Sequence, residues 1–211
     1  MIERHAPAAP ATVFDIGGGA GAYALWLSER GYAVHLLDPI DRHVAEAERR
    51  SAASSHPLAS CQVGDARSLP FADETADVVL LLGPLYHLTS VEDRIQTLKQ
   101  AARVLKPGGC LFAAAISRWS SVLDGLARDL FTDPQFAAIV AQDLNNGQHR
   151  NSSGRADYFT TAYFHRPEDL RAEVLSAGLE LDGLFGIEGP GWLFSDIAER
   201  QIGRASCRER V

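Results

Sequence analysis

The sequence predicts an α/β protein with a doubly wound, mostly parallel sheet and helices on both of its faces, which makes three layers. Short apolar runs alternate with helical patterns five times between residues 12 and 116, the order that a parallel sheet with helical crossovers requires. A dense glycine cluster follows the first apolar run, and a carboxylate lies at the end of each of the first three runs. The carboxyl edge of such a sheet is where ligands bind, so we expect the functional site there.

The first strand and its turn lie in residues 12–23, T-V-F-D-I-G-G-G-A-G-A-Y, and a helix is expected over residues 20–30. Glycines in this turn allow positive φ and a close approach of a ligand, while the helix start presents free N–H groups. The turn residues expected to bind are Gly17, Gly18, Gly19 and Gly21. Asp15 precedes the turn, where a carboxylate disfavours a pyrophosphate. The alternative is an ordinary strand-to-helix turn that has surplus glycine.

Two more carboxylates follow strands. Asp38 ends an apolar run over residues 32–38 and lies one helix and one strand after the glycine turn, so it should reach the same edge. There it could accept both hydroxyls of a ribose, at about 1.5–3 kcal/mol for each charge-assisted hydrogen bond. The alternative is that Asp38 only caps the next helix, expected over residues 41–53. Asp65 follows a third run over residues 58–63.

The fourth run, residues 76–82, is continuously apolar, as in a central strand covered on both faces. Gly83 and Pro84 end it and place residues 85–88 in a loop above the carboxyl edge. A strongly amphipathic helix is expected over residues 91–105, followed by a K-P-G-G break and a fifth strand over residues 110–116.

The strand and helix alternation stops in residues 117–164. One amphipathic helix is expected from Trp119 to Leu130 and another over residues 136–144, before a polar run over residues 145–154 that we expect not to pack. Four aromatic residues lie near the end of this segment: Tyr158, Phe159, Tyr163 and Phe164. The sequence favours equally that they cover an apolar substrate and that they pack in a core. A helix over residues 166–177 and a sixth strand over residues 179–187 follow.

Composition limits the function classes. The chain has 211 residues, 46% of them hydrophobic, which suits one substantial core. Its net charge of −7 argues against nucleic acid or an anionic membrane as the main partner. Three cysteines without a C-x-x-C pair, and no membrane-spanning run or signal sequence, favour a reducing cytoplasmic location. His35, His43 and His56 have no partners at ligand spacing, so no metal site is expected.

Residues 13–116 resemble a class I S-adenosylmethionine-dependent methyltransferase, in the small-molecule branch related to quinone-biosynthesis enzymes. The matching motifs are D-I-G-G-G-A-G (15–21), H-L-L-D (35–38), G-D-A (64–66), L-G-P-L-Y-H-L (82–88) and L-K-P-G-G (105–109). The resemblance implies a Rossmann-like sheet, with residues 117–164 as a helical lid that carries substrate contacts. It also implies S-adenosylmethionine as the cofactor and a small molecule as the methyl acceptor.

The resemblance assigns roles along the carboxyl edge. Asp15 and the glycine turn would face the methionine moiety, and Asp38 with Pro39 would bind the ribose. Asp65 and the backbone of Ala66 would bind the adenine edge, while Leu82 and Gly83 would border the cofactor. A sulfonium cation without phosphate suits a pocket lined by acids.

Methyl transfer is an in-line displacement, in which alignment of the two reactants supplies most of the rate and a base is needed only if the acceptor loses a proton. His87 is the candidate base and Tyr86 its hydrogen-bonding neighbour. The alternative is that His87 packs or shapes the substrate pocket.

We expect one methyltransferase domain over residues 1–201, with residues 12–116 as the cofactor-binding core, and a foreign or disordered tail over residues 202–211. Residues 1–11 are short for the N-terminal helical segment of the family, and no alternating strand pattern follows Trp192, so the chain is expected to be a fragment. Two other functions stay open. One is a non-catalytic or truncated cofactor-binding form, and the other is a nicotinamide-dependent oxidoreductase, because G-x-G-x-x-A (17–22) fits a dinucleotide turn.

Overall fold

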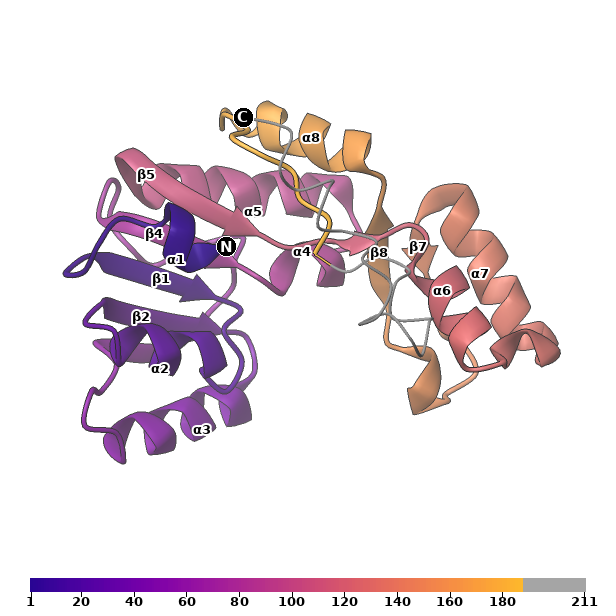
Figure 1. The fold of residues 1–211 in the computed structure, drawn as a ribbon, viewed down its shortest axis with the longest axis horizontal. Coiled ribbons are helices and arrows are strands. Elements are labelled where there is room, and N and C mark those ends of the chain that lie inside the picture. Colours follow the sequence, from indigo (N-terminus) through magenta and orange to yellow (C-terminus); the bar gives the residue numbers. More distant parts are fainter. Residues whose placement is uncertain (188–211) are drawn as a thin grey trace, which may run out of the picture.

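The computed structural model describes residues 1–187, and its centre is a five-stranded parallel sheet with the order β3-β2-β1-β4-β5 (Figure 1). The strands are β1 (Thr12–Ile16), β2 (Ala33–Asp38), β3 (Ser60–Val63), β4 (Ala76–Leu81) and β5 (Leu105–Ala113). The helices beside this sheet are α1 (Ile2–His5), α2 (Ala22–Ser28), α3 (Asp41–Ala52), α4 (Pro84–His87), α5 (Val91–Val104) and α8 (Pro167–Ser176). The order reverses between β1 and β4, which makes this a doubly wound sheet with its switch point beside the glycine turn.

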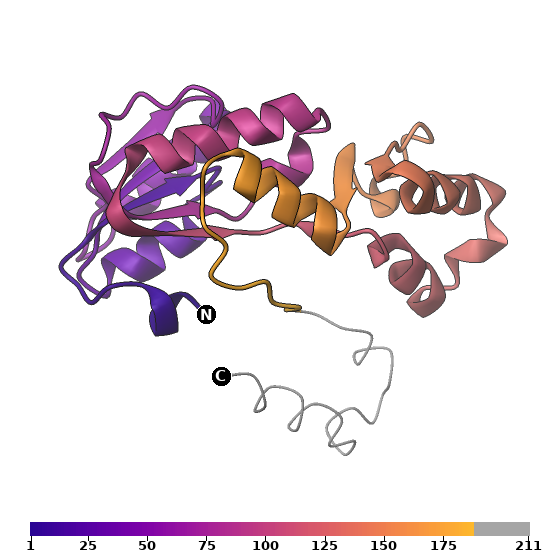
Figure 2. The same ribbon diagram turned by 90° about the horizontal axis from the view of Figure 1, so that it is seen from above.

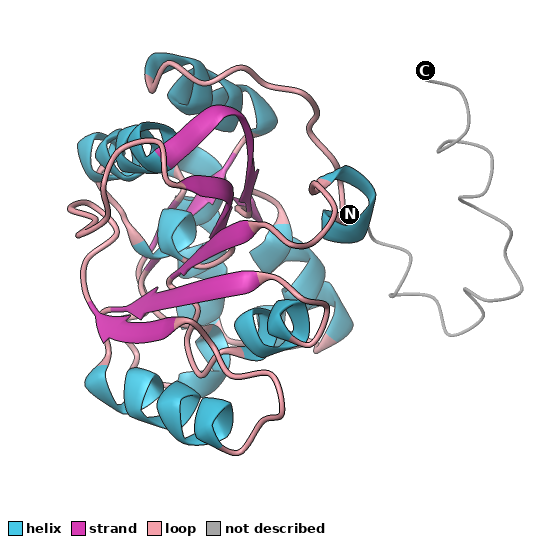
Figure 3. Ribbon diagram, turned by 90° about the vertical axis from the view of Figure 1, so that its left-hand side faces the viewer, coloured by secondary structure: helices cyan, strands magenta, loops and turns pink. Residues whose placement is uncertain are grey.

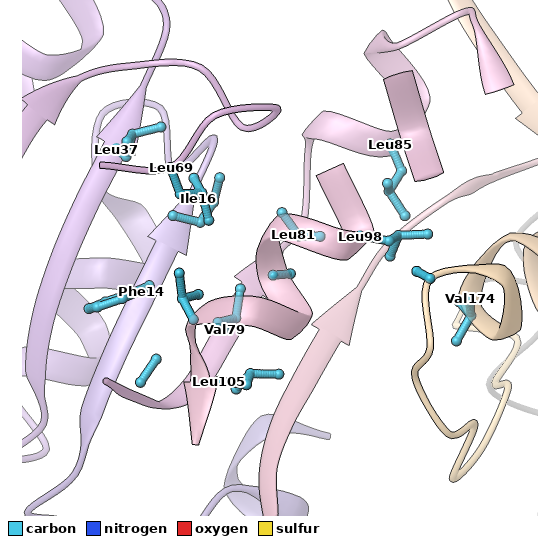
Figure 4. Close-up of a cluster of buried hydrophobic side chains, with 14 of the residues drawn as sticks. Phe14, Ile16, Leu37, Leu69, Val79, Leu81, Leu85, Leu98, Leu105 and Val174 are labelled. Atoms are coloured by element: carbon cyan, nitrogen blue, oxygen red, sulfur yellow. The ribbon is translucent and has the colours of Figure 1, made fainter. Parts of the chain in front are cut away.

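Two hydrophobic cores lie on the two faces of the sheet, because alternate side chains of each strand point in opposite directions. Phe14 and Ile16 of β1 belong to the same core as Leu98 of α5 and Val174 of α8, and Figure 4 labels all four. Val13, which precedes Phe14, faces α2 and α3 on the other side. Figure 3 shows helices on both sides of the strands. The predicted three-layer arrangement is therefore confirmed.

The predictions for the first four strands and for the helices at 41–53, 91–105 and 166–177 are confirmed to within two residues at each end. α5 begins where expected because the hydroxyl of Ser90 caps it, accepting from the N–H of Asp93. The segment expected as a loop over residues 85–88 is instead mostly the short helix α4, whose first position is Pro84. Proline is favoured there because its missing N–H has no helical partner to lose.

The fifth strand differs from the prediction. β5 begins at Leu105 and runs through K-P-G-G, which was expected to break the chain before the strand. β5 pairs with β4 alone within the described residues, and its register shifts between the Ala76 and Val78 pairings, so an edge position and a bulge accommodate Pro107.

The sixth strand predicted over residues 179–187 is wrong, because these residues form no strand. Leu179 and Leu181 pack against the core that contains Phe14. The alternation of apolar and polar residues therefore reflects packing of an irregular segment, which Gly183 and Gly186 keep from extending as a strand.

Residues 117–164, here called the insertion, lie beyond the carboxyl ends of the strands (Figures 1 and 2). They contain α6 (Ser120–Ala127), α7 (Pro134–Asn146), two short 3₁₀ turns (Leu130–Thr132 and Ala156–Tyr158), β7 (Gln148–His149) and most of β8 (Ala162–His165). β8 lies between β7 and β6 (Ile116–Ser117) in a second, small sheet. Both helices fall where the sequence predicts them, and α6 ends earlier, at Ala127.

The polar run at residues 145–154 was expected not to pack, and this is wrong at His149. His149 is 1% exposed, and Nδ1 of its ring lies 2.8 Å from Oδ2 of Asp143, which is itself fully buried. The Nε2 atom lies 2.8 Å from the carbonyl oxygen of Tyr158. The two partners satisfy the polar atoms of the ring, so a polar residue packs in the interior at this position.

Cys61 and Cys110 are half-buried free thiols on β3 and β5, and burial raises the pKa of both. Cys207 and the tail predicted over residues 202–211 lie outside the described residues. None of the described helices has the length and apolar content needed to cross a bilayer.

Candidate functional site

The glycine turn joins the end of β1 to α2 at the carboxyl edge of the sheet. Gly17, Gly19 and Gly21 have φ values of +71°, +56° and +79°, which favour glycine. A Cβ at Gly17 would lie 2.7 Å from the ring of Pro84, so close packing of α4 also requires glycine there. A Cβ at Gly19 would meet nothing within 4 Å. The turn therefore presents bare backbone to open space at Gly19, as a ligand cradle does.

Asp15 lies beneath this turn and is 2% exposed. Its Oδ2 atom has no hydrogen-bond partner among residues 1–187, and a Cβ at Gly18 would lie 2.7 Å from that atom. Burial raises the pKa of Asp15 to about 7, the backbone N–H of Ala24 opposes this shift, and the negative charge of Asp38 adds to it. Asp15 is thus a buried carboxyl with one oxygen to which none of the described residues donates a hydrogen bond, and a nearby cation would favour its ionised form.

Asp38 ends β2 and is 5% exposed. The N–H of Gly19 donates to its Oδ2 at 2.9 Å, and the N–H of Ile40 donates to its Oδ1 at 3.0 Å. The ring of His43, on α3, lies with Nδ1 3.1 Å from the same Oδ1. Asp38 therefore links the glycine turn to α3, while Pro39 beside it is exposed.

Asp65 follows β3 and is more exposed than the other two acids, with 47% of its side chain accessible. Arg67 binds both of its carboxylate oxygens through Nε at 3.0 and 3.1 Å, and the backbone N–H of Arg67 donates to Oδ1 at 2.8 Å. These contacts with Arg67 lower the pKa of Asp65. Ala66 is partly buried against the core. A ligand at Asp65 would therefore share the carboxylate with Arg67.

The residues after β4 complete the edge. Leu82 packs with the core on the α2 face, and Gly83 approaches the glycine turn, since a Cβ there would lie 3.4 Å from the carbonyl oxygen of Gly17. The rings of Tyr86 and His87 lie 4.7 Å apart on α4. Burial raises the pKa of Tyr86. His87 is exposed, yet the protein around its ring lowers its pKa, and the charge of Asp38 opposes this effect.

The structure thus brings Asp15, Asp38, the glycine turn and the start of α4 together at the switch point. Asp65 lies at the next strand end, held by Arg67. Among residues 1–187 no three His, Cys, Asp or Glu side chains are grouped so that they could hold a metal ion.

Sequence comparison assigns this geometry to a family. A profile described as a methyltransferase domain matches residues 14–113. Ubiquinone/menaquinone biosynthesis C-methyltransferase UbiE from Ruegeria sp. (strain TM1040) is 30% identical over 190 residues, which cover 85% of this chain and 70% of that protein. This chain belongs to the class I S-adenosylmethionine-dependent methyltransferases. The predicted family, in its quinone-biosynthesis-like branch, is confirmed.

Other relatives agree with this methyltransferase assignment. Ubiquinone biosynthesis O-methyltransferase of Rhizobium etli (strain CIAT 652) is 28% identical over 175 residues, which cover 83% of this chain and 62% of that protein. This chain therefore spans about three fifths of the length of that relative. A solved S-adenosylmethionine-dependent methyltransferase from Methanosarcina mazei has a TM-score of 0.64 at 21% identity, covering 83% of this chain and 82% of that one. That similarity shows the Rossmann-like fold.

The cofactor of this family is S-adenosylmethionine, and the residues present fit it. Gly19 offers open space above bare backbone, as an unhindered cradle must. The buried Oδ2 of Asp15 lacks a hydrogen-bond partner within residues 1–187, and an acidic pocket suits a sulfonium cation or the ammonium group of a methionine moiety. The family match therefore favours a methyltransferase over a nicotinamide-dependent enzyme.

A buried ion pair that sequence reasoning missed joins α5 to α8, and Tyr163 of the insertion packs against it. Arg94 of α5 is 2% exposed and binds Glu173 of α8, with Nη2 2.6 Å from Oε1. His165 of β8 lies 3.2 Å from the other oxygen of Glu173, and the guanidinium of Arg94 lies 3.7 Å from the centre of the Tyr163 ring. Contacts with His165 and Arg94 lower the pKa of Glu173 against the effect of burial. In the sequence, Arg94 belongs to the charged stripe of an amphipathic helix, so no pattern identifies it.

The four aromatic residues predicted within 158–164 differ in their burial. Tyr158 and Phe164 are 2% and 3% exposed, whereas Phe159 is 43% exposed. Together with Phe136 and His149, these three line a cavity of about 430 Å³ between the small sheet, α6 and α7. Tyr163 instead faces Arg94 on the other side of the small sheet. The residues that line this cavity all belong to residues 116–164, so it is separate from the glycine turn.

Proposed function

We propose that this protein transfers the methyl group of S-adenosylmethionine to a small-molecule acceptor. The observation that carries the proposal is the pair of buried acids, Asp15 and Asp38, at the glycine turn of a chain in the methyltransferase family. One of their oxygens, Oδ2 of Asp15, lacks a partner within the described residues, and Gly19 offers backbone free of steric hindrance. A cationic nucleoside without phosphate is the ligand that satisfies both features.

In this proposal each edge residue has one role. Asp15 and the glycine turn bind the methionine moiety, Asp38 with Pro39 binds the ribose, and Asp65 with the backbone of Ala66 binds the adenine. Leu82 and Gly83 border the cofactor where α4 approaches the turn. The cofactor supplies the electrophilic methyl group, and the chain supplies alignment and exclusion of water.

His87 is proposed as the base that removes a proton from the acceptor, with Tyr86 as its neighbour. The lowered pKa of His87 supports this role, because the ring is then neutral and able to accept a proton near pH 7. A packing or substrate-shaping role is the alternative, and the exposed position of His87 on α4 fits either one.

We further propose that residues 12–116 bind the cofactor and that residues 117–164 select the acceptor, within one domain over residues 1–201. The acceptor class that the relatives' names suggest is a phenol or quinol of quinone biosynthesis, methylated on oxygen or carbon. Neither nucleic acid nor an anionic membrane suits a chain of net charge −7, and a cytoplasmic location stays a prediction.

Calorimetry tests cofactor binding, with S-adenosylmethionine, S-adenosylhomocysteine and a nicotinamide dinucleotide titrated into the same preparation. We expect micromolar binding of the first two and none of the third. Radiolabelled methyl transfer to a panel of quinols, phenols and amines then tests catalysis. Binding without transfer to any acceptor would favour the non-catalytic alternative, and dinucleotide binding alone would overturn the proposal.

A further inference from the structure

α4, the helix that carries His87, is too short to hold its own position. It has four residues, and the N–H of Leu88 after it donates to the carbonyl oxygen of Pro84 at 3.1 Å. Isolated helices shorter than about 12 residues are marginal in water, because the first turn costs more entropy than its hydrogen bond returns. The last carbonyl groups of a helix also lack partners within it. The position of α4 therefore depends on contacts with other parts of the chain.

The first end of α4 is held at the glycine turn. The ring of Pro84 packs so closely there that a Cβ at Gly17 would lie 2.7 Å from it. Leu85 is fully buried in the core that contains Phe14. These contacts fix where α4 begins relative to the turn, and the other end needs partners of its own.

Two side chains hold that other end by its carbonyl groups. Nη1 of Arg94, on α5, donates to the carbonyl oxygen of Leu88 at 2.9 Å. Nε2 of Gln148, on β7 of the insertion, donates to the carbonyl oxygen of Thr89 at 2.9 Å. α4 also contacts β8 in the same small sheet (Figure 1). The end of α4 is therefore fastened both to the core and to the insertion.

The guanidinium of Arg94 is itself held in one orientation. Its Nε lies 3.0 Å from each carboxylate oxygen of Glu173, and its plane lies 3.7 Å from the centre of the Tyr163 ring. Arg94 is 2% exposed. Because the guanidinium is a rigid planar fork, these contacts also set the direction of the N–H groups that face Leu88. The donor to the end of α4 is therefore preoriented.

We infer that Arg94 and Gln148 are positioning residues that hold the end of α4 and thereby set the place of His87 relative to the glycine turn. The inference rests on the proposed function, because it assumes that His87 acts on the methyl acceptor. Alignment of the reacting groups supplies much of the rate, and a displacement of about 1 Å can cost about 10²-fold. The insertion thus contributes to the rate through Gln148, in addition to its proposed selection of the acceptor.

Gln148→Glu is the main test variant. Glutamate has nearly the same size, but its ionised carboxylate cannot donate to Thr89, and it still accepts from Arg150, whose Nη2 lies 2.7 Å from Oε1 of Gln148. The matched control is Gln135→Glu, the same change at an exposed position of α7. Arg94→Lys is the second variant, which keeps a cation beside Glu173 and loses the planar fork. Thermal unfolding checks that each variant is folded.

The first measurement is amide hydrogen exchange of Leu88, followed by NMR without ligand, so it requires no activity. We expect exchange about tenfold faster in Gln148→Glu and in Arg94→Lys than in wild type, because one ordinary hydrogen bond corresponds to about that factor. Amides of β4 in the same spectra report global unfolding and should not change in Gln148→Glu. Gln135→Glu should match wild type at Leu88.

The second measurement is kcat for methyl transfer, in a double-mutant cycle of Gln148→Glu with His87→Gln. Gln148→Glu should lower kcat about tenfold when His87 is present and less than about twofold in the His87→Gln background, because its effect passes through His87. The dissociation constant of S-adenosylhomocysteine should stay within about threefold of the wild-type value in Gln148→Glu.

Unchanged exchange at Leu88 in Gln148→Glu and Arg94→Lys would overturn the inference. An equal loss of kcat in both backgrounds would also overturn it, because Gln148 would then act without His87. In both cases wild type still transfers methyl groups, so the proposed function stands. A wild type that transfers to no acceptor would refute the proposed catalysis and, with it, a positioning role for these two residues.

Discussion

The substitution Asp15→Asn tests whether burial beneath the glycine turn disfavours the ionised form of Asp15. Asp15 is 2% exposed, and its pKa is raised from 3.8 to about 7, chiefly by burial. A shift of this size corresponds to about 4 kcal/mol that ionised Asp15 costs the folded state, since each pKa unit is about 1.4 kcal/mol. Asparagine has nearly the same shape and stays neutral, so the variant should escape this cost.

The sign follows from the pKa of Asp15 in the two states. A raised folded pKa means that the contribution of Asp15 to stability is fully present below pH 3.8 and is lost as the pH rises to about 7. The advantage of Asp15→Asn in free energy of unfolding should therefore grow by about 1.4 kcal/mol per pH unit between pH 5 and 7 and then level off.

Urea denaturation without cofactor, followed by circular dichroism at 25 °C from pH 5 to 9, measures this difference. Glu46→Gln, a change at a partly exposed acid of α3, is the control and should show no such trend. A difference between Asp15→Asn and wild type that stays constant across this range would refute the reasoning.

Three further predictions concern the cofactor, the base and the buried ion pair between α5 and α8. A sulfonium cation favours ionised Asp15, so the ratio of the affinities for S-adenosylmethionine and S-adenosylhomocysteine should rise about fivefold or more from pH 6 to 8.5. In Asp15→Asn this ratio should be independent of pH. Calorimetry measures both affinities. If His87 is the base, His87→Gln should lower kcat about 10²-fold on a phenolic acceptor, while Tyr86→Phe changes it by less than about threefold. Wild-type kcat should then fall as the pH drops below 6.5, because the pKa of His87 is lowered from that value. A kcat of His87→Gln close to that of wild type would instead assign His87 to packing. Arg94→Met should lower the free energy of unfolding by about 3–5 kcal/mol, because it leaves the carboxylate of Glu173 buried without its cation. The double variant with Glu173→Leu should recover much of this loss, as measured by urea denaturation. Equal losses in the single and double variants would contradict that account.

The parts of this fold that the sequence predicts are those set by local pattern. The run before Asp15 is apolar because β1 is buried on both faces, and the glycines after it are needed where φ is positive. Parallel strands place their carboxyl ends together, so the strand-end acids could be assigned to one edge. Their order along the chain was therefore enough to locate the candidate site.

The parts that the sequence does not predict depend on contacts between distant residues. Arg94 and Glu173 are 79 positions apart, and each alone is an ordinary helical charge. β6 and β7 have two residues each, too short for any alternation to be recognised. At residues 179–187 the alternation was present without a strand, because packing of Leu179 and Leu181 against the core produces the same pattern.

The most direct test of the account is the affinity of wild type, Asp38→Asn and Glu46→Gln for S-adenosylhomocysteine, measured by calorimetry at pH 7.5. Asp38 is buried between the glycine turn and α3, whereas Glu46 is a partly exposed acid on α3. We predict micromolar binding to wild type and Glu46→Gln, and binding at least about tenfold weaker to Asp38→Asn. Equal binding to all three proteins would contradict the claim that the acids at this edge hold the cofactor.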